Sequence, residues 1–443
     1  MMRVPIVATN NYRCVLGILA LLFLPAESVV AQDVSSARKA NRNTLFSSFS
    51  FEGEIVQKAG ADWNVKLDNN NKERSFNLEP AIELALSFAL RGKSQAYLNL
   101  QYGREMEIED EDDERERSYK SSLEVDEGFL QFTDHFDKES ITKKTSLTIG
   151  RFSLSDKREW FFDKSLDGVL ISFELEPIDT RFSLSLNREE LFGSDLLRHN
   201  EVDPVNNFIV VAEHEPFKNL DLELSAYSII RHDRSADNES PRFYGVTSNG
   251  KLVDERISWW AGLAWARGEE DEENIKGFGF DIGATIFLRS RFRPYIILAY
   301  AFGSGDGDTD SDFRQTDLQG NSDKFGGVTS FKYYGELVDP ELSNLQVVTT
   351  GMGFRYRPAA SIDIVLHRFR QDVPLDELRS SDLKEDPNGD SKNLGVELDI
   401  VWGTELTSNV ESELVLGYFI PGSAFDDNTD NAFLVNAKLS YKF

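Results

Sequence analysis

The last twelve residues of the chain alternate between apolar and polar side chains. The apolar positions of this stretch are Phe433, Val435, Ala437, Leu439, Tyr441 and Phe443, and the polar positions between them are Asn436, Lys438, Ser440 and Lys442. Because successive side chains of a strand point to opposite faces, the pattern predicts a strand with one apolar and one polar face. Alternation that runs up to a final aromatic residue is typical of the last strand of an outer-membrane barrel, where closure removes the exposed strand edge.

Similar segments of about ten alternating residues recur along the chain, separated by turn-forming residues. They predict eighteen strands, near residues 44–57, 75–90, 94–106, 121–133, 144–154, 167–176, 179–188, 205–214, 220–230, 242–250, 256–267, 276–288, 292–302, 343–357, 361–371, 392–403, 408–418 and 432–443. The predicted fold is therefore all-β, a single closed antiparallel transmembrane β-barrel of about 18 strands. An even strand number predicts that both termini are periplasmic.

The lengths of the connectors support this count. The short connectors 91–93, 177–179, 216–219 and 357–361 all fall on the predicted periplasmic side. The long connectors fall on the opposite side: 58–74, 107–120, 155–166, 189–204, 268–275, 303–342, 372–391 and 419–431. Short inner turns and long outer loops are the expected asymmetry. Segment 242–250 is the least regular strand, and a soluble β-sandwich or solenoid is the alternative fold.

The amino terminus predicts export. Arg3 and Arg13 precede a short apolar run, 15–24, and small residues precede Gln32, so residues 1–31 are predicted to be a signal peptide. The barrel domain would be residues 32–443, with the first dozen as a disordered periplasmic tail. The one cysteine, Cys14, lies in the signal peptide, which suits passage through an oxidising periplasm. The predicted location is the cell outer membrane.

Bulk composition fits this location although the mean hydropathy is only −0.39. In a barrel only alternate residues need to face lipid. The formal net charge of −28 argues against nucleic acid as a partner, because phosphate contacts need a basic surface.

Three segments resemble the alginate export family of outer-membrane channels: residues 149–168, residues 300–319, and residues 354–371 taken with 416–425. The resemblance implies an eighteen-stranded channel that passes an exopolysaccharide from periplasm to exterior through a constriction of arginines and a few acids. By motif, the residues that would line this pore and bind the substrate are Arg151, Asp156, Arg158, Glu159 and Asp163, with Arg355 and Arg357 as weaker additions.

The residues themselves suit such a conduit. Alternation over 343–357 points Arg355 and Arg357 inward, and other strands place acids inside, so the lumen is polar and mixed in sign. A guanidinium grips a carboxylate while staying charged, and facing acids would keep the contact weak enough for release. Arg151 shares its parity with apolar Ile149, so we hypothesise that Gly150 hosts a bulge that turns Arg151 inward.

Three other groups have both a plain and a functional interpretation. The acid-rich run 105–117 is expected to be a solvated outer loop, with divalent-cation bridging to lipopolysaccharide as the alternative. Alternating aspartates at 306–312 resemble a calcium loop but lack its glycine and bidentate glutamate. His367 shares a strand face with Asp363, which leaves a barrel hydrolase as a minor alternative.

The sequence therefore predicts passive export of an anionic, alginate-like polysaccharide, with loops 155–166 and 303–342 folding over or into the lumen as gates. A general or substrate-selective porin for small solutes is the runner-up. The expected partners are the polysaccharide, outer-membrane lipid and lipopolysaccharide, a periplasmic delivery protein and the barrel-assembly machinery. No enzyme activity, cofactor or resident metal is predicted.

Overall fold

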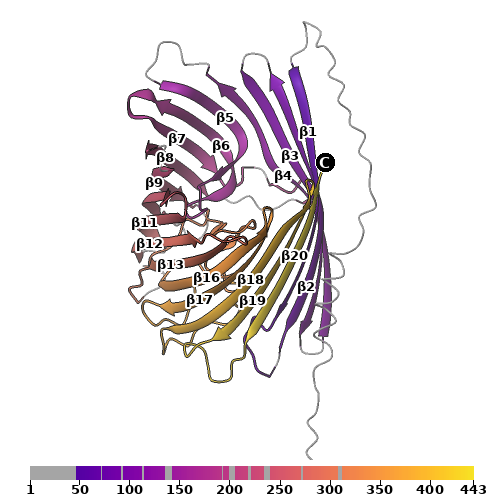
Figure 1. Ribbon diagram of the computed structural model, residues 1–443, viewed down its shortest axis with the longest axis vertical. Coiled ribbons are helices and arrows are strands. Elements are labelled where there is room, and N and C mark those ends of the chain that lie inside the picture. Colours follow the sequence, from indigo (N-terminus) through magenta and orange to yellow (C-terminus); the bar gives the residue numbers. More distant parts are fainter. Residues whose placement is uncertain are drawn as a thin grey trace, which may run out of the picture.

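Eighteen antiparallel strands form one continuous sheet in a computed structural model of the chain (Figure 1). The structure describes residues 46–70, 72–90, 93–111, 114–134, 142–191, 193–198, 205–217, 221–233, 240–270, 273–307 and 312–443. The predicted signal peptide and the tail that follows it lie outside the described residues.

The strands of the first half are β1 (Phe46–Trp63), β2 (Arg74–Leu90), β3 (Ser94–Glu111), β4 (Glu114–Thr133), β5 (Thr142–Ser155), β6 (Asp163–Leu175), β7 (Thr180–Arg188), β8 (Asn206–Phe217) and β9 (Leu222–His232). Those of the second half are β10 (Arg242–Leu252), β11 (Ile257–Glu270), β12 (Glu273–Phe287), β13 (Pro294–Gly303), β16 (Leu345–Arg357), β17 (Ala360–Gln371), β18 (Asn393–Thr407), β19 (Val410–Pro421) and β20 (Ala432–Lys442). Two short strands, β14 (Ser322–Asp323) and β15 (Phe331–Lys332), pair only with each other.

The sheet closes on itself because β20 pairs with β1 as well as with β19. Tyr441 is opposite Ile55, and Phe433 is opposite Trp63. The predicted eighteen-stranded closed barrel is confirmed, and so is the alternating final strand. Even segment 242–250, the least regular in sequence, is a full strand.

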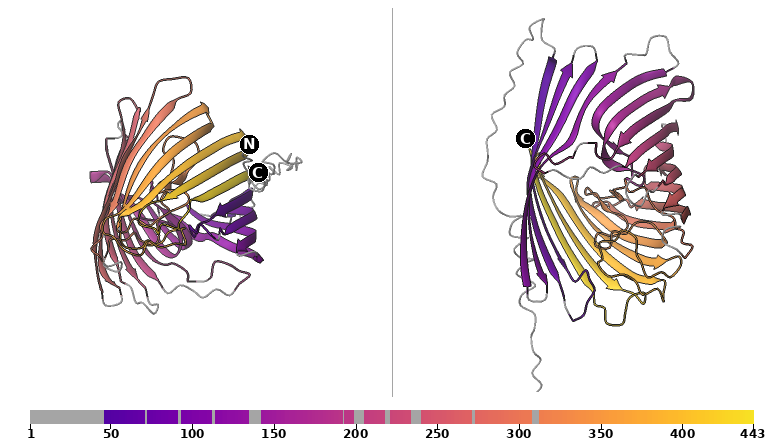
Figure 2. Two further views of the ribbon diagram at one scale, coloured as in Figure 1. Left: turned by 90° about the horizontal axis from the view of Figure 1, so that it is seen from below. Right: turned by 180° about the vertical axis from the view of Figure 1, so that it is seen from behind.

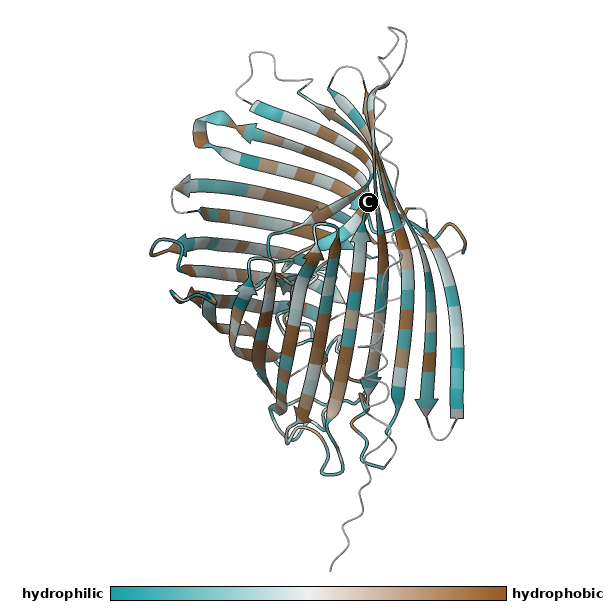
Figure 3. Cartoon of the chain, turned by 45° about the vertical axis from the view of Figure 1, so that its right-hand side comes forward, coloured by the Kyte–Doolittle hydropathy of each residue, from teal (hydrophilic) through white to brown (hydrophobic). Residues whose placement is uncertain are grey.

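The two faces of each strand differ as the alternation predicts. On β17, Ile364 and Leu366 are exposed on the outer face, whereas Asp363, Val365 and His367 are buried on the inner face. The bands of contrasting hydropathy along single strands are visible in Figure 3. Apolar residues outside and polar residues inside are what a lipid environment requires.

Two of the predicted long outer connectors are wrong. β3 and β4 pair up to Glu111 and Glu114, and β11 and β12 pair up to Glu270 and Glu273, so 107–120 and 268–275 are mostly hairpin strands. Acidic residues lower strand propensity only weakly when both faces are in water, and pairing with a neighbouring strand overrides that preference. The acid-rich run is therefore largely a β-hairpin, and only its tip falls outside the described residues.

One junction in the wall is incomplete. β4 pairs with β5 only over residues 128–133, and the two strands separate from Gly128 and Arg151 onward, below their paired ends in Figure 1. Residues 194–196 of the connector after β7 contact the free edge of β4, with backbone hydrogen bonds to Leu123 and Val125. The side chains of Leu196 and Leu197 are exposed. This connector therefore covers part of the free edge of β4 where the regular pairing stops.

The connector between β13 and β16 lies inside the ring of strands (Figure 2). Its Phe313 packs on Gly277 and Gly279 of β12, and its Thr329 packs on Gly403 of β18. A side chain at any of these glycines would occupy the space that the connector uses. No helix in the described residues is long and apolar enough to cross a membrane.

Candidate functional site: a luminal constriction around Arg158

The connector 156–162, between β5 and β6, is a tight loop organised by Asp156. The Asp156 Oδ1 accepts hydrogen bonds from the backbone N–H groups of Phe161 (2.8 Å) and Phe162 (3.0 Å). The backbone N–H of Glu159 donates to the Asp156 carbonyl oxygen at 2.9 Å. Burial raises the pKa of Asp156, and these backbone donors oppose that shift. Asp156 therefore has a clear positioning role in this loop.

Aromatic residues fix the loop to the inner wall. Trp160 packs on Gly262 of β11, and Phe161 packs on Gly245 of β10. The Trp160 Nε1 donates a hydrogen bond of 2.9 Å to the Tyr334 hydroxyl of the β13–β16 connector. The two connectors therefore meet in the lumen, and each restricts the other.

Arg158 lies where the connectors and the wall meet. Its guanidinium carbon is 4.0 Å from the ring centre of Trp260 and 4.3 Å from that of Tyr333. Its nitrogens are 3.4 Å from carboxylate oxygens of Asp281 and of Asp323. Only 13% of the side chain is exposed. Two aromatic faces and two carboxylates thus hold one cation at the constriction.

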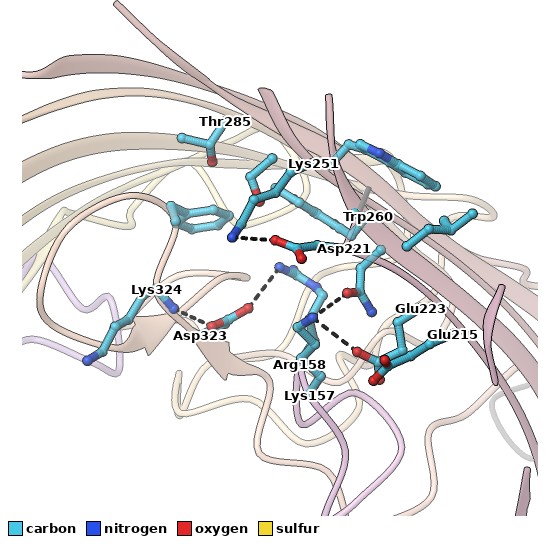
Figure 4. Close-up of a pocket in the computed structure, with 16 residues that line it drawn as sticks. Lys157, Arg158, Glu215, Asp221, Glu223, Lys251, Trp260, Thr285, Asp323 and Lys324 are labelled. Carbon is cyan, nitrogen blue, oxygen red and sulfur yellow. Dashed lines mark hydrogen bonds and ion pairs between the residues drawn. The ribbon is translucent and has the colours of Figure 1, made fainter. Parts of the chain in front are cut away.

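A polar cavity of about 310 Å³ opens beside Arg158 (Figure 4). Its charged lining residues are the cations Lys157, Arg158, Lys251 and Lys324 and the acids Glu215, Asp221, Glu223 and Asp323. Lys157 contacts Glu223 at 3.1 Å, and Lys251 contacts Asp221 at 2.8 Å. Glu215, Glu223 and Lys251 come from the ends of β8, β9 and β10 next to short turns, and Asp323 comes from β14. The cavity is mixed in sign, as the sequence predicts for the lumen.

Glu159 and Asp163 face the same part of the β13–β16 connector. A Cβ at Gly320 would lie 2.5 Å from Glu159 Oε2 and 3.2 Å from Asp163 Cβ, so both side chains contact this backbone. Burial, followed by the charges of Asp163, Asp323 and Asp156, raises the pKa of Glu159 to about 7. The predicted residues Asp156, Arg158, Glu159 and Asp163 therefore do lie together.

Arg355 and Arg357 lie apart from this cluster. Arg355 points inward as predicted, and its Nε and Nη2 donate to the carbonyl oxygens of Gly326 (2.8 Å) and Gly327 (3.0 Å). It thereby holds the β13–β16 connector against β16. Arg357 is exposed at the turn before β17, next to a shift in register.

Arg151 forms an ion pair within the wall. Its Nη1 is 3.3 Å from Asp167 Oδ2, and 13% and 11% of the two side chains are exposed. The pairing register does not shift at Gly150, although this glycine has a φ of +129°. Arg151 has the same strand parity as the exposed Ile149, which is the outward face of β5. Its partner Asp167 also accepts a hydrogen bond of 2.8 Å from the backbone N–H of Leu191. The bulge hypothesis is not supported, and a role of Arg151 in the pore stays a prediction.

Asp363 lies beneath Gly327 of the β13–β16 connector, and His367 lies among buried residues of the inner wall rather than at an open surface. His367 Nδ1 is 2.9 Å from Thr349 Oγ1, its Nε2 is 3.3 Å from Asp399, and the Tyr295 hydroxyl donates to Asp363. The His367 and Asp363 side chains are fully buried.

The candidate calcium loop is described only in part. Asp308 and Asp310 fall outside the described residues, and Asp306 donates its backbone N–H to Asp312. Among the described residues there is no group of three or more histidine, cysteine, aspartate or glutamate residues that could hold a metal ion.

Sequence reasoning missed most of the partners of Arg158. These partners are Trp260 on β11, Asp281 on β12, and Asp323 and Tyr333 of the β13–β16 connector. Trp260 and Tyr333 are 102 and 175 residues from Arg158 in the sequence. The Trp259–Trp260 and Tyr333–Tyr334 pairs are the one visible signal, because adjacent aromatics place one ring on each side of an extended chain.

A second part of the lumen runs along β1 to β4. A cavity of about 420 Å³ there is lined by Lys58, Glu83, Lys120, Glu124 and Asp195, among others. Its residues are mainly polar, and the β13–β16 connector does not contribute to its lining. The inner space is therefore divided between a densely packed half and an open polar half.

Comparison with known proteins identifies one matching family and a group of solved structures that share the fold. A family model described as alginate export matches residues 205–434. The alginate production protein AlgE of Pseudomonas aeruginosa is 25% identical over 224 residues. That match covers 42% of this chain and 45% of AlgE, so the chain spans less than half the length of this relative.

Solved structures share the fold. OccK7 (OpdD) of Pseudomonas aeruginosa matches with a TM-score of 0.60 and 13% identity, over 90% of this chain and 99% of that one. OpdQ of the same organism matches with a TM-score of 0.56 and 9% identity, over 89% and 98% of the two chains. At such low identity the likeness concerns the fold alone. Taken with the family match, this outer-membrane porin fold places the chain in the outer membrane.

Proposed function

The chain belongs to the alginate export family, and on this premise we propose that it is a channel for passive export of an anionic, alginate-like exopolysaccharide. The premise covers the part of the barrel from β8 to β20. The substrate, the direction of transport and the roles of single residues are proposals that the luminal geometry supports.

The observation that carries the proposal is the guanidinium of Arg158, which two aromatic rings and two carboxylates surround. Its two carboxylate partners lie at 3.4 Å, longer than the usual hydrogen bond, and of the two only Asp323 is substantially exposed. A uronate carboxylate entering the adjoining cavity can replace Asp323, whose side chain is one-third exposed. The guanidinium would then bind the sugar acid while Trp260 still supports its other face.

The acidic residues of the cavity favour passage of the polymer over its tight binding. Lys157, Lys251 and Lys324 would attract successive carboxylates, and Glu215, Asp221 and Glu223 would repel them. A channel must bind its substrate weakly enough to release it. Alternating charges along the cavity would let a polymer move in steps without being trapped.

The two luminal connectors would act as gates. Residues 156–162 and the β13–β16 connector contact each other through Trp160 and Tyr334. A polymer could pass only if they separate or if it follows the open polar half of the lumen. Arg355 fixes the second connector at its far side, so it supports the gate rather than contacting the polymer.

Transport would need partners. A periplasmic protein would deliver the polymer, the barrel-assembly machinery would insert the chain, and lipid and lipopolysaccharide would surround it. We expect no enzyme activity, because burial of His367 leaves no access for a substrate.

Planar-bilayer recordings test the proposal. Wild-type channels should prefer anions, and acidic oligouronates should block the current at millimolar concentration or below. The variant Arg158→Ala should lose most of the block and shift the reversal potential toward cations. The control Arg291→Ala removes an arginine that also lies over an aromatic ring, Phe292, but in an exposed turn.

Two results would contradict this function. A wide current that oligouronates leave unblocked would favour the porin for small solutes. Lipid or peptide hydrolysis that His367→Ala abolishes would favour the hydrolase. Unchanged anion preference in Arg158→Ala would remove Arg158 from the selectivity mechanism.

A further inference from the structure

Three cations form a row on the outer face of the barrel. Arg242 on β10 is directly opposite Arg267 on β11, which is directly opposite Lys276 on β12. All three side chains are exposed, and they share the outward parity of Tyr244, Trp265 and Phe278. The row lies at the start of β10 and three residues from the Glu270–Glu273 end of the β11–β12 hairpin.

Such a row is unfavourable without an anion. Residues directly opposite in a sheet have Cβ atoms about 5 Å apart, and like charges in these positions repel. Among the described residues no carboxylate forms an ion pair with these three cations, and Glu269, the next outward residue on β11, forms none either. Arg267 donates to the carbonyl oxygens of Ala266 and Gly277, which leaves most of its donors for a ligand.

An apolar groove lies below the row on the same face. Tyr244, Trp265 and Phe278 form the row of cross-strand partners next to the cations. Beyond them a depression of about 480 Å³ opens over β7 to β11. Its apolar lining on the outer face is Ala212, Leu224, Ala226, Val246, Ala261 and Leu263, and Thr180, His214 and Ser248 add polar groups to the same face.

The spacing fits one molecule. From Arg242 to Val246 is four residues, about 13 Å along a strand. A lipid whose phosphate contacts the cations would therefore place an acyl chain against the aromatic row and in the groove. Val246 and Leu263 are exposed and directly opposite each other, and the small residues Ala226, opposite Val246, and Ala261, two residues from Leu263, leave room for that chain beside them.

We propose that the row Arg242–Arg267–Lys276 and the groove below it form a binding site for the phosphorylated lipid A part of lipopolysaccharide. The phosphates would bind the three cations and offset their mutual repulsion, and one acyl chain would fill the groove. The assignment to the outer leaflet rests on the orientation of the barrel in the proposed function, but binding itself does not depend on polymer transport.

Titration of the full-length protein in nanodiscs of phosphatidylethanolamine, with a chelator present, tests the site. The ligands are diphosphorylated lipid A, its dephosphorylated form and phosphatidylglycerol. Removing three charges near a membrane surface should weaken binding roughly hundredfold, so Arg242→Gln/Arg267→Gln/Lys276→Gln should lose lipid A. The control Arg289→Gln/Arg291→Gln/Arg293→Gln removes three exposed arginines from the turn after β12 and should bind normally.

Two further variants cover the remaining outcomes. Lys276→Gln alone, which leaves both arginines, should weaken binding about fivefold and serves if the triple variant fails to fold. Ala261→Phe should fill the groove and weaken lipid A binding while every cation stays in place. The proposal is overturned if dephosphorylated lipid A binds equally well, if phosphatidylglycerol binds more tightly, or if the groove instead joins two copies of the chain without lipid.

Discussion

The carboxylate of Glu397 accepts a hydrogen bond of 2.7 Å from the backbone N–H of Leu337. Its second oxygen accepts another, of 3.1 Å, from Val338. Glu397 is a fully buried residue of β18, and Leu337 belongs to the β13–β16 connector. One wall side chain therefore holds two consecutive donors of the luminal connector, which ties its position to the barrel.

Replacing Glu397 with alanine should loosen this connector. The variant leaves two buried N–H groups without an acceptor, at about 1–3 kcal/mol each, and opens a space beneath Leu337. We expect a larger single-channel conductance and more frequent openings in planar bilayers. Glu413→Ala is the matched control, because Glu413 faces inward on β19 without a hydrogen bond to the connector among the described residues. Equal conductance in wild type and Glu397→Ala would show that another contact holds the connector.

Gly277→Ala should displace the start of the same connector. A Cβ at Gly277 would lie 2.2 Å from the Phe313 Cα, and backbone cannot move aside as a flexible side chain can. Loss of the buried Phe313 contact should cost about 3 kcal/mol and lower the thermal unfolding temperature. Gly103→Ala on β3 is the control, since its Cβ would meet only Ser122 Oγ at 3.4 Å. If both variants unfold at the same temperature as wild type, the connector does not pack on β12 in solution.

Channel opening should increase as pH rises toward neutrality. The pKa of Glu159 in the folded protein, about 7, lies above its ordinary value of 4.5, so the packed loop favours the uncharged acid. Its contribution to packing is complete below about pH 4.5 and is lost as pH rises to about 7. Open probability measured from pH 4.5 to 8 should therefore rise.

Glu159→Gln should make this pH profile shallower. It should not abolish the profile, because burial also raises the pKa values of Glu336 and Glu341 to about 7. Glu215→Gln, in the same luminal cavity but without contact to Gly320, is the control. A profile that Glu159→Gln leaves unchanged would assign the titration to the other acids.

Arg151→Ala should affect the wall more than the pore. The variant leaves the carboxylate of Asp167, which is mostly buried, without its cationic partner. Such an unpaired buried charge should lower the free energy of unfolding by about 3 kcal/mol. We expect a lower unfolding temperature and an unchanged reversal potential, with stability restored in part by the exchange Arg151→Asp/Asp167→Arg. A shifted reversal potential with normal stability would instead support the role in the pore that the sequence predicts.

The sequence by itself determined the barrel. Alternation decides which face of a strand meets lipid, and in a membrane every strand edge must be paired, so eighteen alternating segments close into a ring. The same logic placed Arg355 inward and Phe433 to Phe443 on a final strand. It failed at the hairpin tips, where water on both faces removes the contrast that marks a strand's end.

Only the tertiary structure decided what fills the barrel. The connectors carry no period, because their backbone follows the inner wall and not a sheet, so their contacts depend on glycines such as Gly262 and Gly277 far away in the chain. The cage of Trp260 and Tyr333 around Arg158 arises in the same way. Local patterning sets strands and their faces, whereas contacts across a lumen depend on which side chains closure of the ring brings together.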